Sequence, residues 1–297
     1  MRVELRQIRQ FIAVAETLNF RQAAEKLAVS QPALSRGIQQ LEERLGVRLL
    51  ERNNRMVEIT AAGTVFLKGC SQLLAELEST IRKTKKVNSG DIGCLTIGYT
   101  DFAITGILPS LLDNFRRQHP DIAIELAYGS TQEQLKELAT RKIDMAFLTG
   151  PINNADLVHW PVQVDRFVAV LSDRHRLAGR TEVDICELAD EPFVVGVMTR
   201  WRDFRRHLDA LCLQAGFQPD IVQEAYNSEG IFGLVSANIG ITIHLECAVN
   251  YKRAGVVMLP LTGTSARVVT EAVWLKEDTS PMVQCFITTA LSDISID

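Results

Sequence analysis

Apolar residues recur at helical spacing in two short stretches near the start of the chain. One stripe comprises Phe20, Ala23, Ala24 and Leu27, and the other comprises Leu34, Ile38, Leu41 and Leu45. This pattern predicts two amphipathic helices that share one small core. The segment between them is too short to hold structure of its own, so the helices must meet at a steep angle, as in a helix-turn-helix unit.

The N-terminal end of the second helix suits DNA. Ser30 stands at the N-cap position, and Pro32 falls in the first turn, where a missing N–H removes no helical bond. Gln pairs with adenine edges, Arg pairs with guanine, Ala and Pro contact thymine methyl groups, and a helix N-terminus attracts phosphate. An ordinary helical hairpin with a solvated polar face is the alternative. The candidate DNA-binding residues here are Ser30, Gln31, Pro32, Ala33, Ser35, Arg36 and Gln39.

Residues 49–60 alternate apolar and polar side chains around the pair Asn53 and Asn54. Such alternation around a turn predicts a short β-hairpin, or wing. Arg52 and Arg55 lie at its tip, where their charges suit the phosphate backbone.

A third helical pattern runs from Thr60, its expected cap, to about Lys86. Its apolar residues recur at steps of four or three residues, which is typical of a coiled-coil seam. A lone helix with so narrow a stripe is poorly stable, so we expect it to pair with its copy from a second subunit. Packing onto its own chain is the alternative. The seam positions are Phe66, Cys70, Leu73, Leu77 and Ile81.

Charge is distributed unevenly along the chain, whose formal net charge is −4. Residues 1–86 hold 15 Lys and Arg against 9 Asp and Glu, a net of +6, whereas the remainder holds 17 against 27, a net of −10. Nonspecific affinity for DNA comes mainly from local basic surface, so the front of the chain suits DNA and the acidic rear should point away from it.

Beyond a hinge-like stretch at residues 83–93, rich in Lys, Gly, Ser and Asn, apolar runs alternate with amphipathic helices. This alternation predicts an α/β architecture. The expected strands are 95–99, 122–126, 143–148, 167–171, 193–197, 221–224, 240–244 and 268–275. The expected helices are 107–115, 131–139, 202–215, 229–237 and 281–291.

Three loops that follow expected strands carry hydroxyl groups, amides or a cation, and ligands of open α/β sheets bind beyond the carboxyl ends of strands. They suit a small organic anion, with Arg200 or Arg202 as its counter-charge. Ser130 and Thr131 as plain helix caps, and Phe204 as a core residue, are the alternatives. The loop residues are Thr100, Asp101, Phe102, Gly129, Ser130, Thr131, Met198, Thr199, Arg200 and Trp201.

Several classes of protein are disfavoured. No apolar run is long enough to span a bilayer, and the N-terminus lacks the pattern of a secretory signal, so we expect a cytoplasmic protein without a membrane partner. That absence also disfavours a secreted solute-binding protein. The six cysteines form no C-x-x-C pair, the five histidines are scattered, and the common nucleotide, metalloprotease and hydrolase motifs are missing. We expect no enzyme activity, no cofactor and no metal site.

Residues 1–90 closely resemble the DNA-binding and linker region of the LysR-type transcriptional regulators. The resemblance rests on ELRQIRQFIAVAETLNF, AAEKLAVSQPALSRGIQQLEERLG, LLER and TAAG. It extends to the effector domain of that family through LTIGYTDFAITGILPSLLDNFRRQHPDIAIEL, KELATRKIDMAF and GLVSANIGITI.

The resemblance implies an α+β multidomain protein. It would consist of a winged helix-turn-helix domain (1–59), a linker and dimerisation helix (60–87), a hinge (88–93) and an effector-binding domain (94–297). That last domain would resemble periplasmic binding proteins, with lobe I at about 94–163 and 268–297, lobe II at about 164–267, and two crossover strands. The implied partners are double-stranded promoter DNA, a small-molecule effector such as an organic acid or aromatic carboxylate, and further copies of the chain in a tetramer of two dimers. RNA polymerase is a further candidate partner, and the regulator would act as an activator or a repressor.

The resemblance also implies roles for single residues. Positions matching Gln31, Pro32, Ser35 and Arg36 meet DNA in the family, wing residues such as Arg52 and Arg55 lie on its backbone, and positions matching Thr100, Thr131 and Phe204 often bind carboxylates. The full set of candidate effector-binding residues is Thr100, Asp101, Phe102, Ser130, Thr131, Thr199, Arg200, Trp201, Phe204 and His244.

Departures from the family pattern qualify these roles. Gly37 replaces a longer polar residue, which predicts a missing DNA contact, and Arg21 replaces a hydroxyl residue, which predicts a weaker cap but a new phosphate contact. Asp101 replaces a small residue or Pro. Three roles are open to it: it caps its helix, it pairs with Arg200, or it recognises a basic or polyhydroxyl ligand. His244 and Glu246 depart from an apolar pair, and His244 either makes binding pH-sensitive or is a satisfied residue at a strand end.

Overall fold

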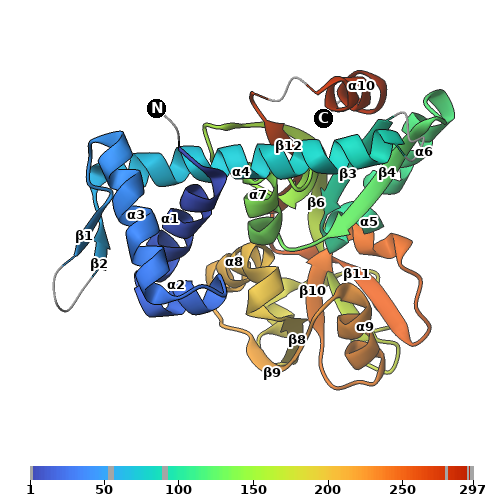
Figure 1. The fold of residues 1–297 in the computed structure, drawn as a ribbon. Coiled ribbons are helices and arrows are strands. Elements are labelled where there is room, and N and C mark those ends of the chain that lie inside the picture. Colours follow the sequence, from blue (N-terminus) through green and yellow to red (C-terminus); the bar gives the residue numbers. More distant parts are fainter. Residues whose placement is uncertain (1–2, 53–56, 89–92, 278–279, 293, 295–297) are drawn as a thin grey trace. The chain divides into compact units, whose positions relative to one another are not determined.

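The computed structural model describes residues 3–52, 57–88, 93–277, 280–292 and 294. The chain divides into two compact units, Met1–Arg82 and Lys83–Asp297. Figure 1 shows the order of the elements along the chain.

The first unit is a winged helix-turn-helix fold. Helices α1 (Leu5–Thr17), α2 (Phe20–Lys26) and α3 (Gln31–Leu45) surround a core that includes Phe11, Leu34 and Ile38, all fully buried. Strands β1 (Leu50–Arg52) and β2 (Val57–Ile59) pair antiparallel, as the alternating pattern predicts. The predicted Asn53–Asn54 turn lies outside the described residues.

Capping side chains set the start of both helices of the pair. The Ser30 hydroxyl accepts a hydrogen bond from the Ala33 amide at 3.4 Å, as predicted, and Pro32 lies in the first turn of α3. The expectation of a weak cap at α2 is wrong. Asn19, one residue before the helix, accepts hydrogen bonds from the Arg21 amide at 2.9 Å and the Gln22 amide at 3.2 Å.

Helix α4 (Ala61–Asn88) begins where the wing ends. The Thr60 hydroxyl accepts a hydrogen bond from the Gly63 amide at 2.9 Å, which is the predicted cap. At Gly63 the helix passes so close to the wing that a Cβ atom would lie 2.1 Å from the Leu49 carbonyl oxygen. Only glycine allows this approach, so Gly63 fixes where the linker helix packs against the base of the wing.

The second unit is built on one large sheet with the strand order β4-β3-β5-β12-β6-β11-β7. Strands β3 (Gly93–Tyr99), β4 (Ile122–Tyr128) and β5 (Met145–Thr149) are parallel. Together with α5 (Asp101–Thr105), α6 (Leu108–Gln118), α7 (Thr131–Ala139), α10 (Pro281–Phe286) and the π-helical turn Ile287–Leu291, they form lobe I.

Lobe II follows the long strand β6 (Leu157–Ser172). It contains the parallel pair β8 (Pro192–Gly196) and β9 (Asp220–Ala225), helices α8 (Met198–Gln214) and α9 (Ser228–Ser236), and strands β10 (Thr242–Leu245) and β11 (Val256–Thr262). Two short 3-10 helices, Ile185–Leu188 and Glu246–Asn250, and strand β7 (Val183–Asp184) complete it.

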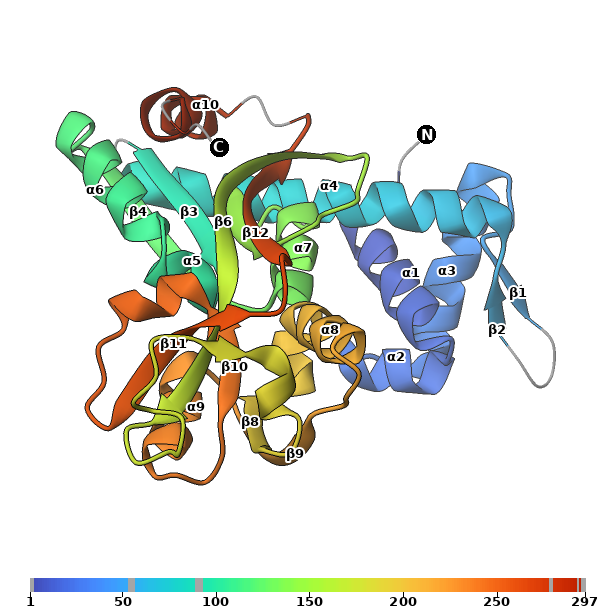
Figure 2. The same cartoon turned by 180° about the vertical axis from the view of Figure 1, so that it is seen from behind.

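Two strands join the lobes, as the family resemblance implies. The first part of β6 pairs with β12 (Arg267–Leu275), and its second part pairs with β10 and β11 (Figure 2). Strand β12 also pairs with β5, so this part of the chain lies in the sheet of lobe I. None of the described helices is long and apolar enough to cross a membrane.

Candidate functional site

The predicted DNA-reading residues of α3 lie on its solvent side. Gln31, Pro32, Ala33, Arg36 and Gln39 are exposed and Ser35 is half-buried, while the apolar stripe of the same helix is buried in the core. Gln39 donates a hydrogen bond to Glu43 at 3.2 Å. Arg36 forms no ion pair with any residue that the structure describes.

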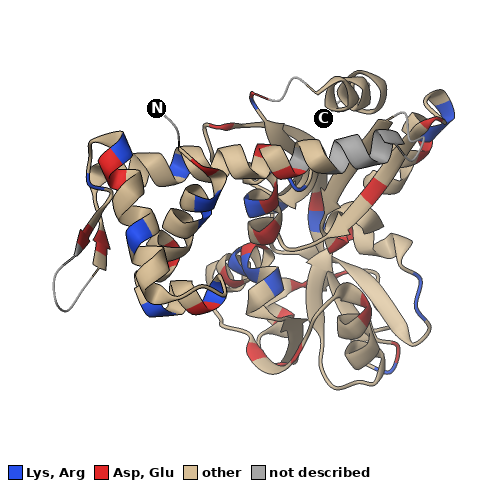
Figure 3. Ribbon diagram, viewed as in Figure 1, with Lys and Arg blue, Asp and Glu red and all other residues tan. Residues whose placement is uncertain are grey.

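Other basic candidates of the first unit are placed differently. Arg21 on α2 is exposed and pairs with Glu25 at 3.1 Å, an exposed contact that phosphate can replace at little cost. Arg52 ends β1, but its side chain and all of Arg55 lie outside the described residues. Figure 3 shows Lys and Arg segments along α1, α2 and α3, and an acidic segment on each wing strand.

Gly37 faces the protein interior. A Cβ atom there would lie 2.1 Å from the buried Gln10 Oε1 of α1, and Gln7 donates a hydrogen bond to the Gly37 carbonyl at 3.5 Å. The expectation of a missing DNA contact at this position is therefore wrong, because the side of α3 that carries Gly37 packs on α1.

The predicted seam on α4 divides into two parts. Phe66 packs edge-on against Phe11 at 5.4 Å between ring centroids, so this end of the stripe packs within its own chain, and Cys70 is buried. Leu77 is half-buried, whereas the side chains of Leu73 and Ile81 are 47 % and 45 % exposed. The exposed part is the one that remains available to a second subunit.

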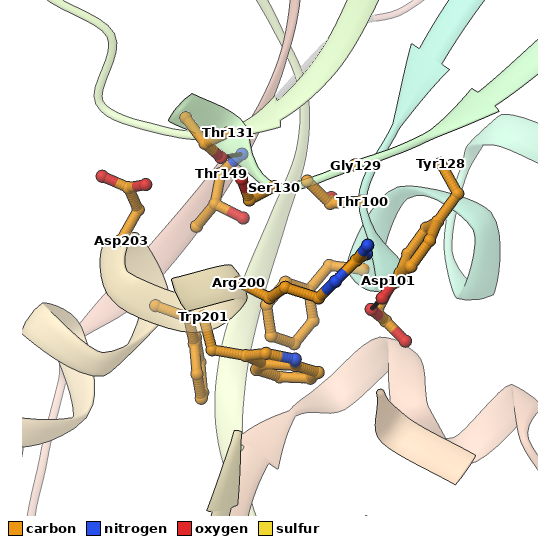
Figure 4. A pocket seen from close by; sticks show the side chains of 12 residues that line it. Thr100, Asp101, Tyr128, Gly129, Ser130, Thr131, Thr149, Arg200, Trp201 and Asp203 are labelled. Carbon is orange, nitrogen blue, oxygen red and sulfur yellow. Dashed lines mark hydrogen bonds between the residues drawn. The ribbon is translucent and has the colours of Figure 1, made fainter. Parts of the chain in front are cut away.

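A cleft between lobes I and II gathers most of the predicted effector residues (Figure 4). Its empty volume is about 340 Å³, mouth included, and its walls leave room for about one water molecule between them. The lining residues are Thr100, Asp101, Phe102, Tyr128, Gly129, Ser130, Thr131, Thr149, Arg200, Trp201, Asp203 and Phe204.

The three hydroxyl groups predicted to bind ligand differ in their partners. Ser130 caps α7 in a capping box with Glu133, whose pKa is lowered by the hydrogen bonds from the Ser130 amide and hydroxyl. The Thr131 hydroxyl accepts a hydrogen bond from the Thr149 amide at 3.2 Å. The Thr100 hydroxyl oxygen is buried and has no hydrogen-bond partner among the described residues.

Asp101 joins the two lobes. One carboxylate oxygen accepts a hydrogen bond from the Tyr128 hydroxyl at 2.5 Å, and the other accepts one from the Ser228 amide, in the first turn of α9, at 3.0 Å. Asp101 therefore caps a helix of the other lobe and not its own. Burial and the neighbouring Asp101 carboxylate raise the pKa of Tyr128, while the Arg200 guanidinium, 4.9 Å from the centre of the Tyr128 ring, opposes that rise.

Aromatic rings form the floor of the cleft. Phe102 of lobe I inserts into the lobe II core, with ring centroids 4.7 Å from Phe204, 5.3 Å from Trp201 and 4.9 Å from His244. His244 lies behind this layer and does not line the cleft. It is 1 % exposed, its Nε2 lies 3.1 Å from the Ser228 hydroxyl, and burial lowers its pKa to about 4.

The structure corrects the predicted loop around Arg200. The segment from Met198 onward already forms the first turn of α8. Val197, the residue before the helix, provides no side-chain cap, so the sequence carries no signal for this helix start. Thr199 is exposed on this turn and does not line the cleft, whereas Arg200 and Trp201 do.

Three lining residues were missed from the sequence. Tyr128 is the last residue of β4, directly before the predicted loop, and Asp203 follows Arg200 by three positions on α8, so strand-end position and helical spacing indicate both in retrospect. Thr149 ends β5, so the same strand-end position indicates it as well. Asp203 accepts a hydrogen bond from Gln132 of lobe I at 3.1 Å. No group of His, Cys, Asp and Glu among the described residues has the arrangement of a metal site.

Both units of the chain match models of known protein families. Residues 5–64 match the family model described as "Bacterial regulatory helix-turn-helix protein, lysR family", and residues 88–294 match the model described as "LysR substrate binding domain". The chain belongs to the LysR family. This LysR-family protein is a DNA-binding transcriptional regulator with an effector-binding domain.

Relatives and solved structures agree with this assignment. The chain is 38 % identical over 240 residues to the transcriptional regulator AlsR of Bacillus subtilis, covering 81 % of this chain and 80 % of AlsR. It is 33 % identical over 285 residues to the Hca operon transcriptional activator HcaR of Escherichia coli, covering 96 % of each. Full-length BenM superposes with a TM-score of 0.60 at 26 % identity, covering 97 % of this chain and 96 % of BenM. CbnR, at 24 % identity, shares the fold with a TM-score of 0.65 and covers 99 % of this chain and 100 % of its own.

Proposed function

We propose that a small organic acid or aromatic carboxylate, bound in the cleft, controls DNA binding by this LysR-family regulator. The observation that carries the proposal is the buried Thr100 hydroxyl, which has no partner among the described residues. A buried hydroxyl without a hydrogen bond costs about 1 to 3 kcal/mol. An anionic ligand that accepts a hydrogen bond from this hydroxyl removes that cost.

The surrounding groups complete an anion site. The N-terminus of α7 lies at the cleft, and the backbone amides of a first helical turn favour a negative charge there. Arg200 lies across the cleft as a counter-charge. Because the walls leave little room, binding requires the lobes to separate or Arg200 to move. The hydrogen bond between Gln132 and Asp203 and that between Asp101 and Ser228 are the contacts that such an opening breaks.

Thr100→Val tests the site, because valine has the shape of threonine and the Thr100 hydroxyl makes no hydrogen bond with any described residue that would be lost. We expect titration calorimetry with benzoate to show binding to the full-length protein, weakened about tenfold by this substitution. Thr131→Ala is less suitable because it also frees the buried Thr149 amide. Unchanged affinity in Thr100→Val would place the carboxylate elsewhere.

For the DNA side we propose that α3 reads bases through Gln31, Pro32, Ser35 and Arg36 while the wing contacts the backbone. Arg36→Ala should abolish a gel shift with promoter DNA at moderate salt and leave benzoate affinity intact. An equal loss of DNA binding and benzoate binding would show that the two functions do not reside in separate units.

The assembly that fits this function is a dimer held by α4, with two dimers joined in a tetramer on a two-fold DNA site. We propose domain limits of 1–59, 60–87, 88–93 and 94–297 for the reader, the linker helix, the hinge and the effector domain. Ligand entry would then shift the population of cleft conformations and change the angle between dimers.

A further inference from the structure

A second cavity of the effector unit adjoins the cleft. This groove is larger, with about 1130 Å³ of empty space including its open mouth, and it shares only Asp101 and Tyr128 with the cleft lining. The Asp101–Tyr128 pair is thus a wall between the two cavities. Lobe I supplies one side of the groove through β3, α5 and β4, and lobe II supplies the other through α9 and the 3-10 helix that ends at Asn250.

Aromatic rings provide most of the apolar surface of the groove. Tyr99 and Tyr128 lie 5.6 Å apart between ring centroids at an angle of 49°, and Tyr251 on the opposite lobe is held edge-on by Phe232 at 5.6 Å. The Tyr128 side chain is 40 % exposed, and Tyr99 and Tyr251 are half-buried, so solvent reaches all three. A ligand with an apolar body can cover these rings.

The charges around the groove have one sign. Asp101 and Glu229 line it, and no Lys, Arg or His does so among the described residues. Among the described residues, the Asp101 carboxylate is hydrogen-bonded only to neutral groups, the Tyr128 hydroxyl and the Ser228 amide, and no ion pair cancels its negative charge there. Carboxylates beside the negative faces of aromatic rings attract cations.

Tyr128 already holds a cation on its cleft side. The Arg200 guanidinium lies 4.9 Å from the centre of the ring and reaches toward it from α8 (Figure 4). The same chemistry on the groove side requires a cation from outside the chain, since the lining provides none.

We propose that this groove binds an organic cation with an aromatic or apolar body, such as an arylalkyl amine, as a second ligand distinct from the anion in the cleft. The body covers Tyr99 and Tyr251, and the ammonium group lies near Glu229 and Asp101. Because the ligand contacts both lobes and the shared wall, its binding and that of the cleft ligand are coupled, and the coupling is reciprocal.

The test uses titration calorimetry on the full-length protein with phenethylamine and, as matched probe of opposite charge, 3-phenylpropionate. Phenethylamine should bind about tenfold more tightly than the anion in the presence of saturating benzoate, which blocks the cleft. Glu229→Gln, a change of an exposed side chain, should weaken phenethylamine binding about threefold, and Tyr251→Ala about fivefold.

Thr100→Val serves as the control, because Thr100 lines the cleft and not the groove. It should leave phenethylamine affinity unchanged while it lowers benzoate affinity, so that the failure of one site is distinguished from the failure of the other. Equal affinity for amine and anion, no effect of Glu229→Gln, or a loss in Thr100→Val as large as that in Tyr251→Ala would each overturn the proposal.

Discussion

Gly63 illustrates how a single residue controls packing in the first unit. The linker helix approaches the wing so closely at this position that a Cβ atom would lie 2.1 Å from the Leu49 carbonyl oxygen and 2.7 Å from Ile59 Cγ1. Gly69, six residues further along the same helix, has nothing within 4 Å of its missing Cβ. A side chain is therefore excluded at Gly63 and has free space at Gly69, although both glycines lie on one helix.

Gly63→Ala should lower the free energy of unfolding of the winged helix by about 1 to 3 kcal/mol, because the backbone oxygen cannot move aside without disturbing the wing. Gly69→Ala should raise it by up to about 1 kcal/mol, because alanine favours the helix and meets no obstacle. Denaturant unfolding followed by circular dichroism measures both. Similar effects of the two substitutions would contradict the packing at Gly63.

His244 makes the stability of lobe II depend on pH. Its folded-state pKa of about 4 lies below the ordinary value of 6.5 because burial disfavours the charged ring. The unfolded chain therefore takes up the proton first as the pH falls. The stabilisation is fully present above pH 6.5 and is lost as the pH falls from there to about 4.

As the pH falls between those values, the protonation of His244 should lower the free energy of unfolding by about 3 kcal/mol. His244→Phe, which keeps an aromatic ring in contact with Phe102 and Phe232, should reduce the loss by that amount, whatever its stability at neutral pH. Urea unfolding of both proteins at pH 7 and at pH 4 provides the comparison. Parallel losses in the two proteins would show that His244 is not the titrating group.

At the scale of elements, sequence periodicity located most helices and strands but not all of them. Helix α7 has the predicted limits of 131 and 139, since Ser130 and Glu133 form a local capping box. Strand β11 was missed because Pro260 interrupts it; the strand survives through its pairing with β6. Helix α5 was missed because five residues are too few to show a period.

The contact between α5 and α9 shows how elements far apart in sequence depend on one another. Asp101, the first residue of α5, accepts a hydrogen bond from the Ser228 amide of α9 at 3.0 Å. Asn227 satisfies the Gly230 amide of the same helix at 2.8 Å. The Ser228 amide of α9 thus depends on lobe I, whereas the Gly230 amide depends on a local cap.

Asp101→Ala should therefore increase hydrogen exchange at the Ser228 amide about tenfold, because that hydrogen bond is lost and the lobes separate more readily. Exchange at the Gly230 amide is the internal control and should change little. Hydrogen exchange resolved by NMR or by fragmentation mass spectrometry reports both positions. Unchanged exchange at Ser228 would show that Asp101 does not hold the lobes together.

At the scale of the whole molecule, α4 carries apolar surface that its own unit leaves open. Phe66 packs on Phe11, but Leu73 and Ile81 remain 47 % and 45 % exposed. Exposed apolar residues at coiled-coil spacing favour pairing with a second copy.

Leu73→Glu should shift the protein toward monomers by weakening this pairing, by roughly tenfold or more in the dissociation constant, because it places a charge in an apolar seam. Val65→Glu is the matched control, since Val65 is 76 % exposed on the same helix and lies outside the seam. Sedimentation velocity over a range of concentrations measures the association. An identical effect of both substitutions would contradict the predicted seam.

The sequence by itself, together with its family resemblance, determined the two-part organisation, the helix-turn-helix, most strands of the effector unit and nine of the twelve cleft-lining residues, because these follow mainly from local periodicity, capping and position at strand ends. Tertiary structure alone decided that Gly37 faces α1, that Asp101 caps a helix of the other lobe and that His244 lies behind the cleft. These facts depend on contacts between segments distant in sequence, where packing selects among roles that each residue type allows. The DNA-reading surface lies on one helix, so its pattern can be recognised in the sequence. The cleft and its neighbouring groove exist only where the two lobes meet.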